Sequence, residues 1–429
     1  MTSPAVPDAP HFILRRVLPP EAVGNLDSGP VDMEIADGLI RRIGAADTLP
    51  AVDLPVFEGR GRMVWPGFVD LHTHLDKGHI WPRAANPDGS FAGALATVKQ
   101  DRSRHWTAAD IERRFEFGLR CAIAHGTVAI RTHLDCLSPQ HRISWPLFAE
   151  LRDRWRDRVT LQAVALQALD SLDDPVFAEE LASLVARHGG ILGAVVYPSP
   201  ALADQLTRLL RLAARHGLDL DLHVDESLDE GARSLPVLAR AALDEGFAGR
   251  IVVGHCCSLT VQPPDEIDRT LDLMAAAGIG VVSLPLCNLY LQDRQAGRTP
   301  RRRGVTLLHE MAARGIPVAV ASDNCRDPFY AYGDHDLLEV FREAVRIAHL
   351  DHPIGAWPRA VTATPADLMG LAAGRLVEGA AADLVLFTGR SMNELLARPQ
   401  SDRIVLRHGR AIDTTPPDYA ELDDLFTSA

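Results

Sequence analysis

Two histidines separated by one residue, His72 and His74, stand at the end of an apolar run. If that run is a β-strand, side chains alternate between its faces, so both imidazoles point the same way. Two imidazoles at one strand end can chelate a divalent metal, which further imidazole or carboxylate ligands would complete. His223 and Asp323 end two other apolar runs. We therefore expect a metal site made of His72, His74, His223 and Asp323.

Two further residues near strand ends could act on a water molecule in such a site. Glu226 follows His223 by three residues, and a carboxylate there can take a proton from the water and deliver it to a leaving amine. His255 ends another apolar run and could hydrogen-bond the attacking oxygen or the developing negative charge. The alternatives are a solvated loop acid for Glu226 and a buried structural histidine for His255.

Eight apolar, β-branched runs alternate with helix-like Ala/Leu/Arg-rich segments, several of which end at glycine. Eight nearly continuous apolar strands alternating with helices predict an α/β fold of the parallel (β/α)8 barrel type, in which catalytic residues lie at the carboxyl ends of the strands. A doubly wound sheet is the alternative, but the ionisable residues at the ends of the runs favour the barrel. The expected strands are Val64–His72, Thr127–Asp135, Val159–Gln167, Ile191–Pro198, Asp219–His223, Arg250–His255, Ile279–Pro285 and Ile316–Asp323.

The two ends of the chain differ from this pattern, because they contain short β-like runs without intervening helices. We expect residues 1–62 and 376–429 to pair into one small β-sandwich domain, and residues 63–375 to form the barrel. Residues 414–429 carry prolines and several acids and are expected to form a tail or surface segment.

Composition excludes several classes of partner. The 429 residues carry a formal net charge of −13, which disfavours nucleic acid or an anionic membrane as partner. No segment approaches the roughly 20 apolar residues of a membrane-spanning helix. Residues 1–10 lack the basic and apolar segments of a secretory signal, and the six cysteines are scattered. These features predict a cytoplasmic protein without disulfides.

Taken together, the motifs resemble the amidohydrolase superfamily over nearly the whole chain. They are "PGFVDLHTHLDKG" (66–78), "LHVDE" (222–226), "VVGHC" (252–256) and "VASDN" (320–324). Within that superfamily the chain is similar to the bacterial cytosine deaminase group, through "IRTHLD" (130–135), "LPLCNLYLQDR" (284–294), "PRRRGV" (300–305) and "DPFYAYG" (327–333).

The resemblance implies roles for the residues already singled out. It implies that Asp323 binds the metal and handles a proton, that Glu226 shuttles protons to a ring nitrogen, and that His255 helps to hold the hydroxide. Binuclear members of the superfamily bridge two metals with a lysine after the fourth strand. The chain has lysine only at Lys77 and Lys99, so the resemblance implies one metal ion per subunit, Fe(II) or Zn(II).

Two departures from the cytosine deaminase pattern concern the substrate. That group binds its pyrimidine with a glutamine after the third strand, where this chain has Ala168 and places Gln167 one residue earlier. A shift of one residue turns a strand side chain to the other face, so Gln167 can substitute only if the backbone bulges. The group also has a second aspartate after the metal aspartate, where this chain has Asn324, as in relatives that act on s-triazine amines. We expect Gln167, Asn324, Phe329 and Leu286 to bind the substrate.

The resulting functional prediction is a metal-dependent hydrolytic deaminase. It would release ammonia from an amino-substituted nitrogen heterocycle, with cytosine or a cytosine-like ring as the first candidate. The alternatives are an aminotriazine, an isoguanine-like or creatinine-like ring, or hydrolysis of a cyclic amide. The predicted partner is a small heterocyclic amine, without nucleic acid or membrane, and the resemblance implies a homo-oligomer.

Overall fold

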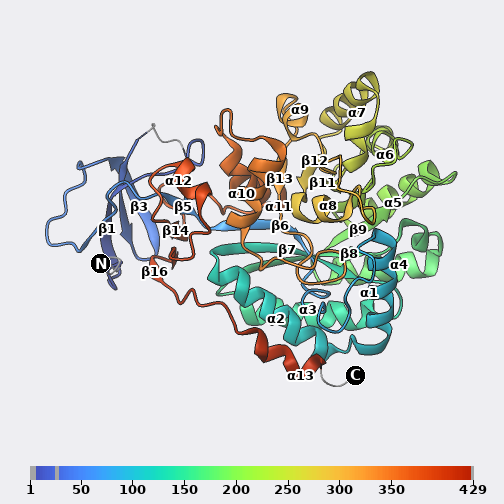
Figure 1. Ribbon diagram of the computed structural model, residues 1–429, viewed down its shortest axis with the longest axis horizontal. Coiled ribbons are helices and arrows are strands. Elements are labelled where there is room, and N and C mark those ends of the chain that lie inside the picture. The colour runs from blue at the N-terminus through green and yellow to red at the C-terminus, as the bar shows by residue number, and fades with distance from the viewer. Residues whose placement is uncertain (1–5, 25–28, 427–429) are drawn as a thin grey trace. The chain divides into compact units, whose positions relative to one another are not determined.

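The computed structural model describes residues 6–24 and 29–426, and its largest sheet has eight strands. The strand order β13-β12-β11-β10-β9-β8-β7-β6 is the reverse of the chain order, and the pairings from β8 to β13 are parallel (Figure 1). The strands are β6 (Phe68–Thr73), β7 (Thr127–Asp135), β8 (Thr160–Leu166), β9 (Ile191–Val196), β10 (Leu220–Val224), β11 (Ile251–His255), β12 (Gly280–Ser283) and β13 (Val318–Val320).

The sheet closes on itself next to the residues expected to bind metal. Thr73 forms a parallel bridge with Asp323, and the backbone N–H of Asp323 donates to the carbonyl of His72 at 2.9 Å. Because the first and last strands meet in this way, the sheet is a barrel, and the predicted (β/α)8 architecture is confirmed.

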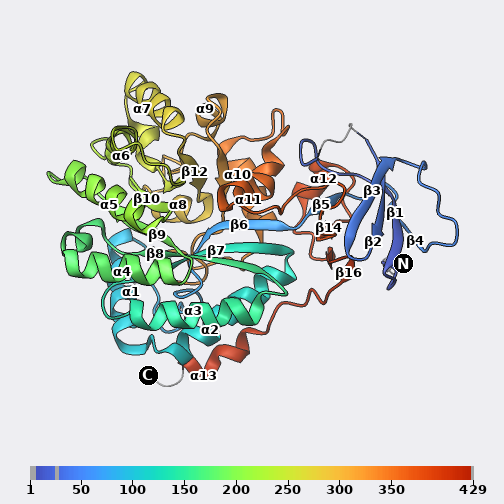
Figure 2. The same cartoon turned by 180° about the vertical axis from the view of Figure 1, so that it is seen from behind.

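Helices alternate with the strands, and Figures 1 and 2 show α4 to α7 on the outside of β8 to β12. Their ends follow from local chemistry: Asp174 caps the first turn of α4, and Gly217 ends α5 in the left-handed region with φ of 63°. The helices are α1 (Phe91–His105), α2 (Ala108–Ala124), α3 (His141–Trp155), α4 (Pro175–Arg187), α5 (Leu202–His216), α6 (Ser234–Asp244), α7 (Pro264–Ala276), α8 (Pro285–Leu291), α9 (Leu308–Ala313), α10 (Leu337–Ala348), α11 (Ala363–Met369), α12 (Met392–Ala397) and α13 (Asp423–Phe426), with 3-10 turns at Leu169–Asp173, Cys257–Val261, Trp357–Val361 and Tyr419–Leu422.

Two four-stranded sheets, ordered β3-β2-β1-β4 and β16-β15-β14-β5, come from the two ends of the chain. One buried cluster contains Phe12 and Met33 of the first sheet together with Leu384 and Leu406 of the second, so the ends form a β-sandwich as predicted. The strands are β1 (His11–Val17), β2 (Val31–Ala36), β3 (Leu39–Ala45), β4 (Val56–Glu58), β5 (Val64–Pro66), β14 (Leu384–Leu386), β15 (Ile404–Arg407) and β16 (Arg410–Ala411).

The chain divides into two compact units whose bounds differ from the expected domains. One unit contains the described parts of residues 1–70, 120–129 and 336–417, and the other contains residues 71–119, 130–335 and 418–426. Residues 418–426, expected with the sandwich, pack on α2 instead, where Tyr419 stacks on Phe117 with ring centroids 5.6 Å apart. Domain boundaries at residues 62/63 and 375/376 therefore stay a prediction.

The expected first barrel strand, Val64–His72, is wrong, because it is two strands that separate at Gly67. The first, β5, pairs antiparallel with β14, and only the second, β6, belongs to the barrel. A Cβ on Gly67 would lie 2.1 Å from Cγ1 of Val128, so a side chain cannot be accommodated there. The unbroken apolar run in the sequence concealed this change of sheet.

Candidate active site

Four imidazoles and one carboxylate from distant parts of the sequence meet at the carboxyl ends of the barrel strands. The ring centroid of His223, on β10, lies 4.6 Å from that of His72 and 5.4 Å from that of His74. Oδ1 of Asp323 lies 3.2 Å from Nε2 of His74 and 3.6 Å from Nε2 of His72. The structure thus brings together His72, His74, His223 and Asp323, which the sequence analysis expected to bind metal.

Asp323 lies in a turn after the eighth barrel strand and not at the end of that strand, where it was expected. The eighth strand was expected to run to Asp323 but β13 ends at Val320, and Asp323 has a φ of 61°. The parallel bridge between Asp323 and Thr73 returns the chain to the barrel edge after this break. The carboxylate is therefore positioned by a left-handed turn rather than by a regular strand.

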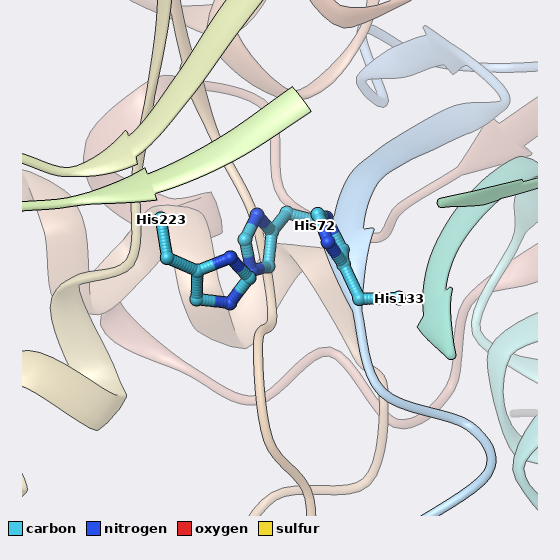
Figure 3. A group of neighbouring side chains, drawn as sticks. All are labelled: His72, His133 and His223. Carbon is cyan, nitrogen blue, oxygen red and sulfur yellow. The ribbon is translucent and has the colours of Figure 1, made fainter. Parts of the chain in front are cut away.

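The fourth imidazole belongs to His133 on β7, to which the sequence analysis assigned no role. Its ring lies against that of His72, tilted by 32° with centroids 3.8 Å apart, and one ring nitrogen each from His72, His133 and His223 lies within 4.8 Å of the other two (Figure 3). Nε2 of His133 also lies 3.7 Å from a carboxylate oxygen of Asp221, whose pKa burial raises to about 6. Its place near the end of a strand in "RTHLD" was the signal that could have identified it.

The chemistry of these donors fits a divalent metal ion. Burial and the neighbouring imidazoles lower the pKa of His72 well below its ordinary value, and burial does the same for His74 and His223, so these rings are neutral and can offer a nitrogen lone pair. Within residues 6–24 and 29–426, neither ring nitrogen of His72 has a hydrogen-bond partner. A buried polar atom without a partner is costly, and a cation held by His72, His74, His223 and Asp323 would satisfy one ring nitrogen of His72.

Glu226 and His255 form the second part of the site. Oε1 of Glu226 lies 3.3 Å from Nδ1 of His255, and the amide nitrogen of Asn288 lies 3.0 Å from the same Nδ1 and 3.4 Å from Oε1. Burial lowers the pKa of His255 to about 3, so its ring is neutral. Because Nδ1 accepts from Asn288, Nε2 carries the proton and is a hydrogen-bond donor.

The environment of Glu226 favours a carboxyl group that holds a proton. Burial raises its pKa well above the ordinary value, the charge of Asp323 raises it further, and Lys77 opposes the shift. A raised pKa suits a group that donates a proton near neutral pH. The structure places Glu226 beside His255 and on the same cavity as Asp323.

A cavity of about 290 Å³ opens over these residues, near the lower end of the usual range for small-molecule sites. Its polar lining contains the reactive groups, and its apolar lining comes mainly from α1 and from the loops after β8, β9 and β13. The lining residues are His74, Lys77, Phe91, Leu95, Val98, Lys99, Arg102, Asp135, Leu137, Leu166, Gln167, Ala168, Val195, Tyr197, His223, Glu226, His255, Asp323, Asn324 and Phe329.

Three of the four residues expected to bind substrate line this cavity: Gln167, Asn324 and Phe329. The fourth, Leu286, is buried in α8 and is not among the lining residues, so its contact with a substrate stays a prediction. Leu286 follows the short strand β12 and belongs to the helix that begins at Pro285.

Gln167 lines the cavity without a bulge in the backbone. Val164 pairs with Ile191, and Ala168 pairs with Val195 in the same register, so no residue is inserted between them. The side-chain nitrogen of Gln167 donates to the carbonyl of Gly193, and its buried Oε1 has no hydrogen-bond partner in the described structure. The backbone therefore has no bulge at Gln167, and its role as the substrate-binding glutamine stays a prediction.

Asn324 and Phe329 are held by one buried carboxylate. Asp327 accepts hydrogen bonds from the side-chain nitrogen of Asn324 at 2.7 Å and from the backbone N–H of Phe329 at 2.8 Å. Burial raises the pKa of Asp327 to about 6, although the hydrogen bond from Asn324 opposes that shift. Both lining residues are thus positioned before a ligand binds.

Sequence reasoning missed the wall of the cavity formed by α1. Phe91, Leu95, Val98 and Lys99 come from this helix, which is the first of two helices between β6 and β7. The ring of Phe91 meets that of Phe329 edge-on at 5.5 Å. The available signal was the long interval between the first two strands, which is more than one crossover helix needs.

With this geometry established, the chain can be compared with known proteins. A model of the Amidohydrolase family matches residues 56–141 and 122–412. The chain belongs to the amidohydrolase family. Its predicted class, a metal-dependent hydrolase acting on carbon–nitrogen bonds in cyclic amidines, is confirmed by this membership together with the deaminases among its relatives.

Three relatives illustrate the similarity. The chain is 54% identical over 428 residues to a pterin deaminase from Rhizobium rhizogenes, covering 98% of both chains. Its fold matches that of a 5-methylcytosine deaminase from Klebsiella pneumoniae with a TM-score of 0.82, at 24% identity over 94% of this chain and 97% of that one. An N-isopropylammelide isopropylaminohydrolase from Burkholderia multivorans gives a TM-score of 0.73, at 25% identity over 95% of this chain and 100% of that one.

None of the helices in the described parts of the chain combines the length and the apolar character that crossing a bilayer requires.

Proposed function

We propose that this amidohydrolase removes the exocyclic amino group of a pterin, a bicyclic 2-amino-4-oxo heterocycle, by hydrolysis. The observation that carries the proposal is the 54% identity with the pterin deaminase of Rhizobium rhizogenes over 98% of both chains. A pterin contains the amino-substituted cyclic amidine that the sequence analysis expected as the reacting group. It differs from cytosine in its second fused ring.

The walls of the cavity support a flat bicyclic substrate. Phe91, Val98 and Leu166 offer apolar surface to an aromatic ring, and Phe329 lies on the same cavity. The free Oε1 of Gln167 can accept a hydrogen bond from a ring N–H, as the amidine half of a pterin presents. Lys77 pairs with Asp135 at 2.8 Å and can direct a further N–H toward a ring oxygen.

The catalytic groups support hydrolytic deamination. A divalent ion held by His72, His74, His223 and Asp323 would lower the pKa of a water molecule from about 15.7 toward 7. Glu226 gives its proton to the neighbouring ring nitrogen, and Asp323 takes one proton from the attacking water and passes it to the amino group. A carbon–oxygen bond forms, the carbon–nitrogen bond to the amino group breaks, ammonia leaves, and the second proton of the water returns to Glu226.

His255 is proposed to stabilise charge during this reaction. Its Nε2–H can donate to the oxygen that adds to the ring carbon, because Nδ1 is already occupied by Asn288. The neutral ring keeps this donor in place over the pH range in which the site works, since burial holds its pKa at about 3.

Cytosine and aminotriazines stay as second candidates, since proteins that act on 5-methylcytosine and on N-isopropylammelide share the fold. Fe(II) and Zn(II) both suit three imidazoles and a carboxylate, so the metal is proposed only as one of these two ions. A cytoplasmic location and a homo-oligomeric state likewise stay predictions.

A substrate panel tests the proposal. Protein loaded with Fe(II) or Zn(II) is assayed for ammonia release from pterin, cytosine, 5-methylcytosine, ammelide, isoguanine and creatinine. We expect pterin to have the highest kcat/KM. Efficient turnover of cytosine with none of pterin would overturn the substrate assignment, and silence on every amine with metal bound would overturn deamination itself.

A further inference from the structure

A second group of metal-ligand side chains lies beside the active site and takes no part in the proposed reaction. His79, Cys325 and His335 are all buried, and each offers one ligand atom within 4.8 Å of the other two. These are two imidazole nitrogens and one sulfur, whereas the active-site group consists of imidazoles and carboxylate. The two groups therefore differ in the kind of cation that they would select.

Two loops at the carboxyl ends of barrel strands bring this second group together, since Cys325 and His335 both lie between β13 and α10. His79 follows β6, and its backbone N–H donates to the carbonyl of Cys325 at 3.0 Å, in the loop after β13. Nδ1 of His335 lies 3.4 Å from the hydroxyl of Thr73, which itself donates to the carbonyl of Asp323 at 2.8 Å. Thr73 thus connects His335 of the second group to the backbone of the active-site residue Asp323.

The backbone at two of the three residues is in an unusual conformation. His79 has a φ of 62° and His335 a φ of 54°, in the left-handed region that non-glycine residues seldom adopt. Such conformations persist where surrounding structure holds them, and they cluster at ligand sites and active sites. Here they direct two imidazoles toward one cysteine.

The imidazole of His79 is a buried polar group without an observed role. Neither of its ring nitrogens has a hydrogen-bond partner in the part of the chain that the structure describes. Burial lowers the pKa of His79 well below its ordinary value, so the ring is neutral and its lone pair is available. Its ring meets Phe117 edge-on at 4.8 Å, and its centroid lies 5.8 Å from that of the His335 ring.

Space around the group is kept by a glycine. A Cβ on Gly118 of α2 would lie 3.1 Å from Nε2 of His335 and 2.9 Å from Cδ2 of Leu75. A methyl group there would therefore press directly on a ligand nitrogen. The small residue at this point is consistent with an imidazole that must keep one orientation.

We propose that His79, Cys325 and His335 form a second, structural metal site for a thiophilic divalent cation of the zinc class. Cysteine sulfur and histidine nitrogen are the usual ligands of structural zinc, with Zn–S of about 2.3 Å and Zn–N of about 2.0 Å. Tetrahedral ligand atoms at those distances lie about 3.3–3.6 Å apart, so the ligand atoms would draw together by no more than about 1.5 Å on binding. The thiol of Cys325 loses its proton to solvent as the sulfur–metal bond forms.

Charges around the group partly offset one another. The carboxylates of Asp334 and Asp327 add negative charge near Cys325, which attracts a cation. Arg326 and Arg114 oppose the cation, because they add positive charge near His79. One thiolate ligand would reduce the charge of a divalent ion at this site to +1.

The site would fix the loop that carries the active-site carboxylate. Cys325 lies two residues after Asp323, and a metal bond to its sulfur would join that loop to the loop after β6. The cation would act on stability and on the position of Asp323, not on the substrate.

Cobalt substitution tests the second site in the complete chain. Protein freed of metal is loaded with Co(II), and the expected results are two ions per chain and a thiolate-to-cobalt charge-transfer absorption. Cys325→Ser should remove that absorption and one ion, and His79→Gln should weaken binding of the same ion. Cys287→Ser is the matched control, because Cys287 is the buried cysteine that contacts Asn324, and it should leave the absorption unchanged.

The results distinguish this site from the proposed reaction. X-ray absorption at the zinc edge of wild-type protein should show a sulfur ligand, and this readout needs no variant to fold. One ion per chain without sulfur coordination would overturn the second site and leave the deaminase proposal intact. Loss of the absorption in Cys287→Ser but not in Cys325→Ser would also overturn it.

Discussion

Glu226 and His255 face each other across 3.3 Å, with Oε1 of the carboxyl group beside Nδ1 of the ring. The amide nitrogen of Asn288 lies close to both atoms and fixes the proton of His255 on Nε2. Asn288 thus orients both Glu226, the proposed proton donor, and His255, the neutral hydrogen-bond donor. The contact between Glu226 and His255 gives each residue a separate role in the proposed reaction.

Glu226→Gln should lower kcat by about 10²- to 10⁴-fold, the usual contribution of a positioned acid or base. The amide keeps the shape of the side chain but cannot transfer a proton. Metal content should stay at the wild-type level, because Glu226 is not among the proposed ligands. Steady-state kinetics and metal analysis of the same preparation check this, and an active Glu226→Gln enzyme would refute the assigned role.

Gln167→Leu should raise KM by about tenfold, which corresponds to the loss of one ordinary hydrogen bond. Leucine has a similar volume but lacks the buried Oε1 acceptor of this cavity-lining residue. Gln140→Leu is the matched control, because Gln140 is also buried and does not line the cavity. An unchanged KM in Gln167→Leu would show that the substrate does not use this acceptor.

Asp327 should give substrate binding a pH dependence. Its pKa of about 6 means that the carboxylate is ionised above pH 6 and gains a proton as the pH falls through 6. Protonation weakens the hydrogen bonds that hold Asn324 and Phe329, so KM should rise by up to about tenfold below that pH.

Asp327→Asn is the variant that isolates this effect. It should have a raised KM at neutral pH and no further rise between pH 7 and 5.5, with metal content measured at each pH to separate ligand protonation from substrate binding. A wild-type KM that stays constant through pH 6 would contradict the role of Asp327.

Removal of metal should abolish activity and lower stability. A ligand that binds only the folded state adds about 2.7 kcal/mol to the free energy of unfolding at 100 times its Kd. Chelation should lower the melting temperature of the wild-type protein. The decrease on chelation should be smaller for His223→Asn, because this variant lacks one ligand of the active-site ion. Full activity after complete metal removal, verified by elemental analysis, would contradict the site.

The sequence predicted the barrel and the proximity of its ligands for a physical reason. Strand ends that are far apart in the chain meet at one edge of a closed parallel sheet, so His72, His74 and His223 could be placed together without knowing any distance. His133 stands at the same edge, but its ring contact with His72 depends on side-chain directions that strand position alone does not determine.

Other parts of the site depend on tertiary packing. Nothing in the local pattern of Phe91–His105 indicates that this helix lines the cavity, and the position of Leu286 inside a helix that starts at Pro285 was not predicted. The close approach of Val128 to Gly67 joins residues that are distant in sequence. The periodicity of apolar residues in the sequence identifies helices and strands. The contacts between those helices and strands decide which side chains line the cavity.

The most direct test of hydrolytic deamination uses water enriched in ¹⁸O. Metal-loaded protein is incubated with pterin, and the product and ammonia are quantified together. The proposal predicts one ammonia per product and one ¹⁸O on the ring carbon that carried the amino group, with Glu226→Gln nearly inactive. A product formed without ammonia, or one in which ¹⁸O enters through opening of the ring, would contradict it.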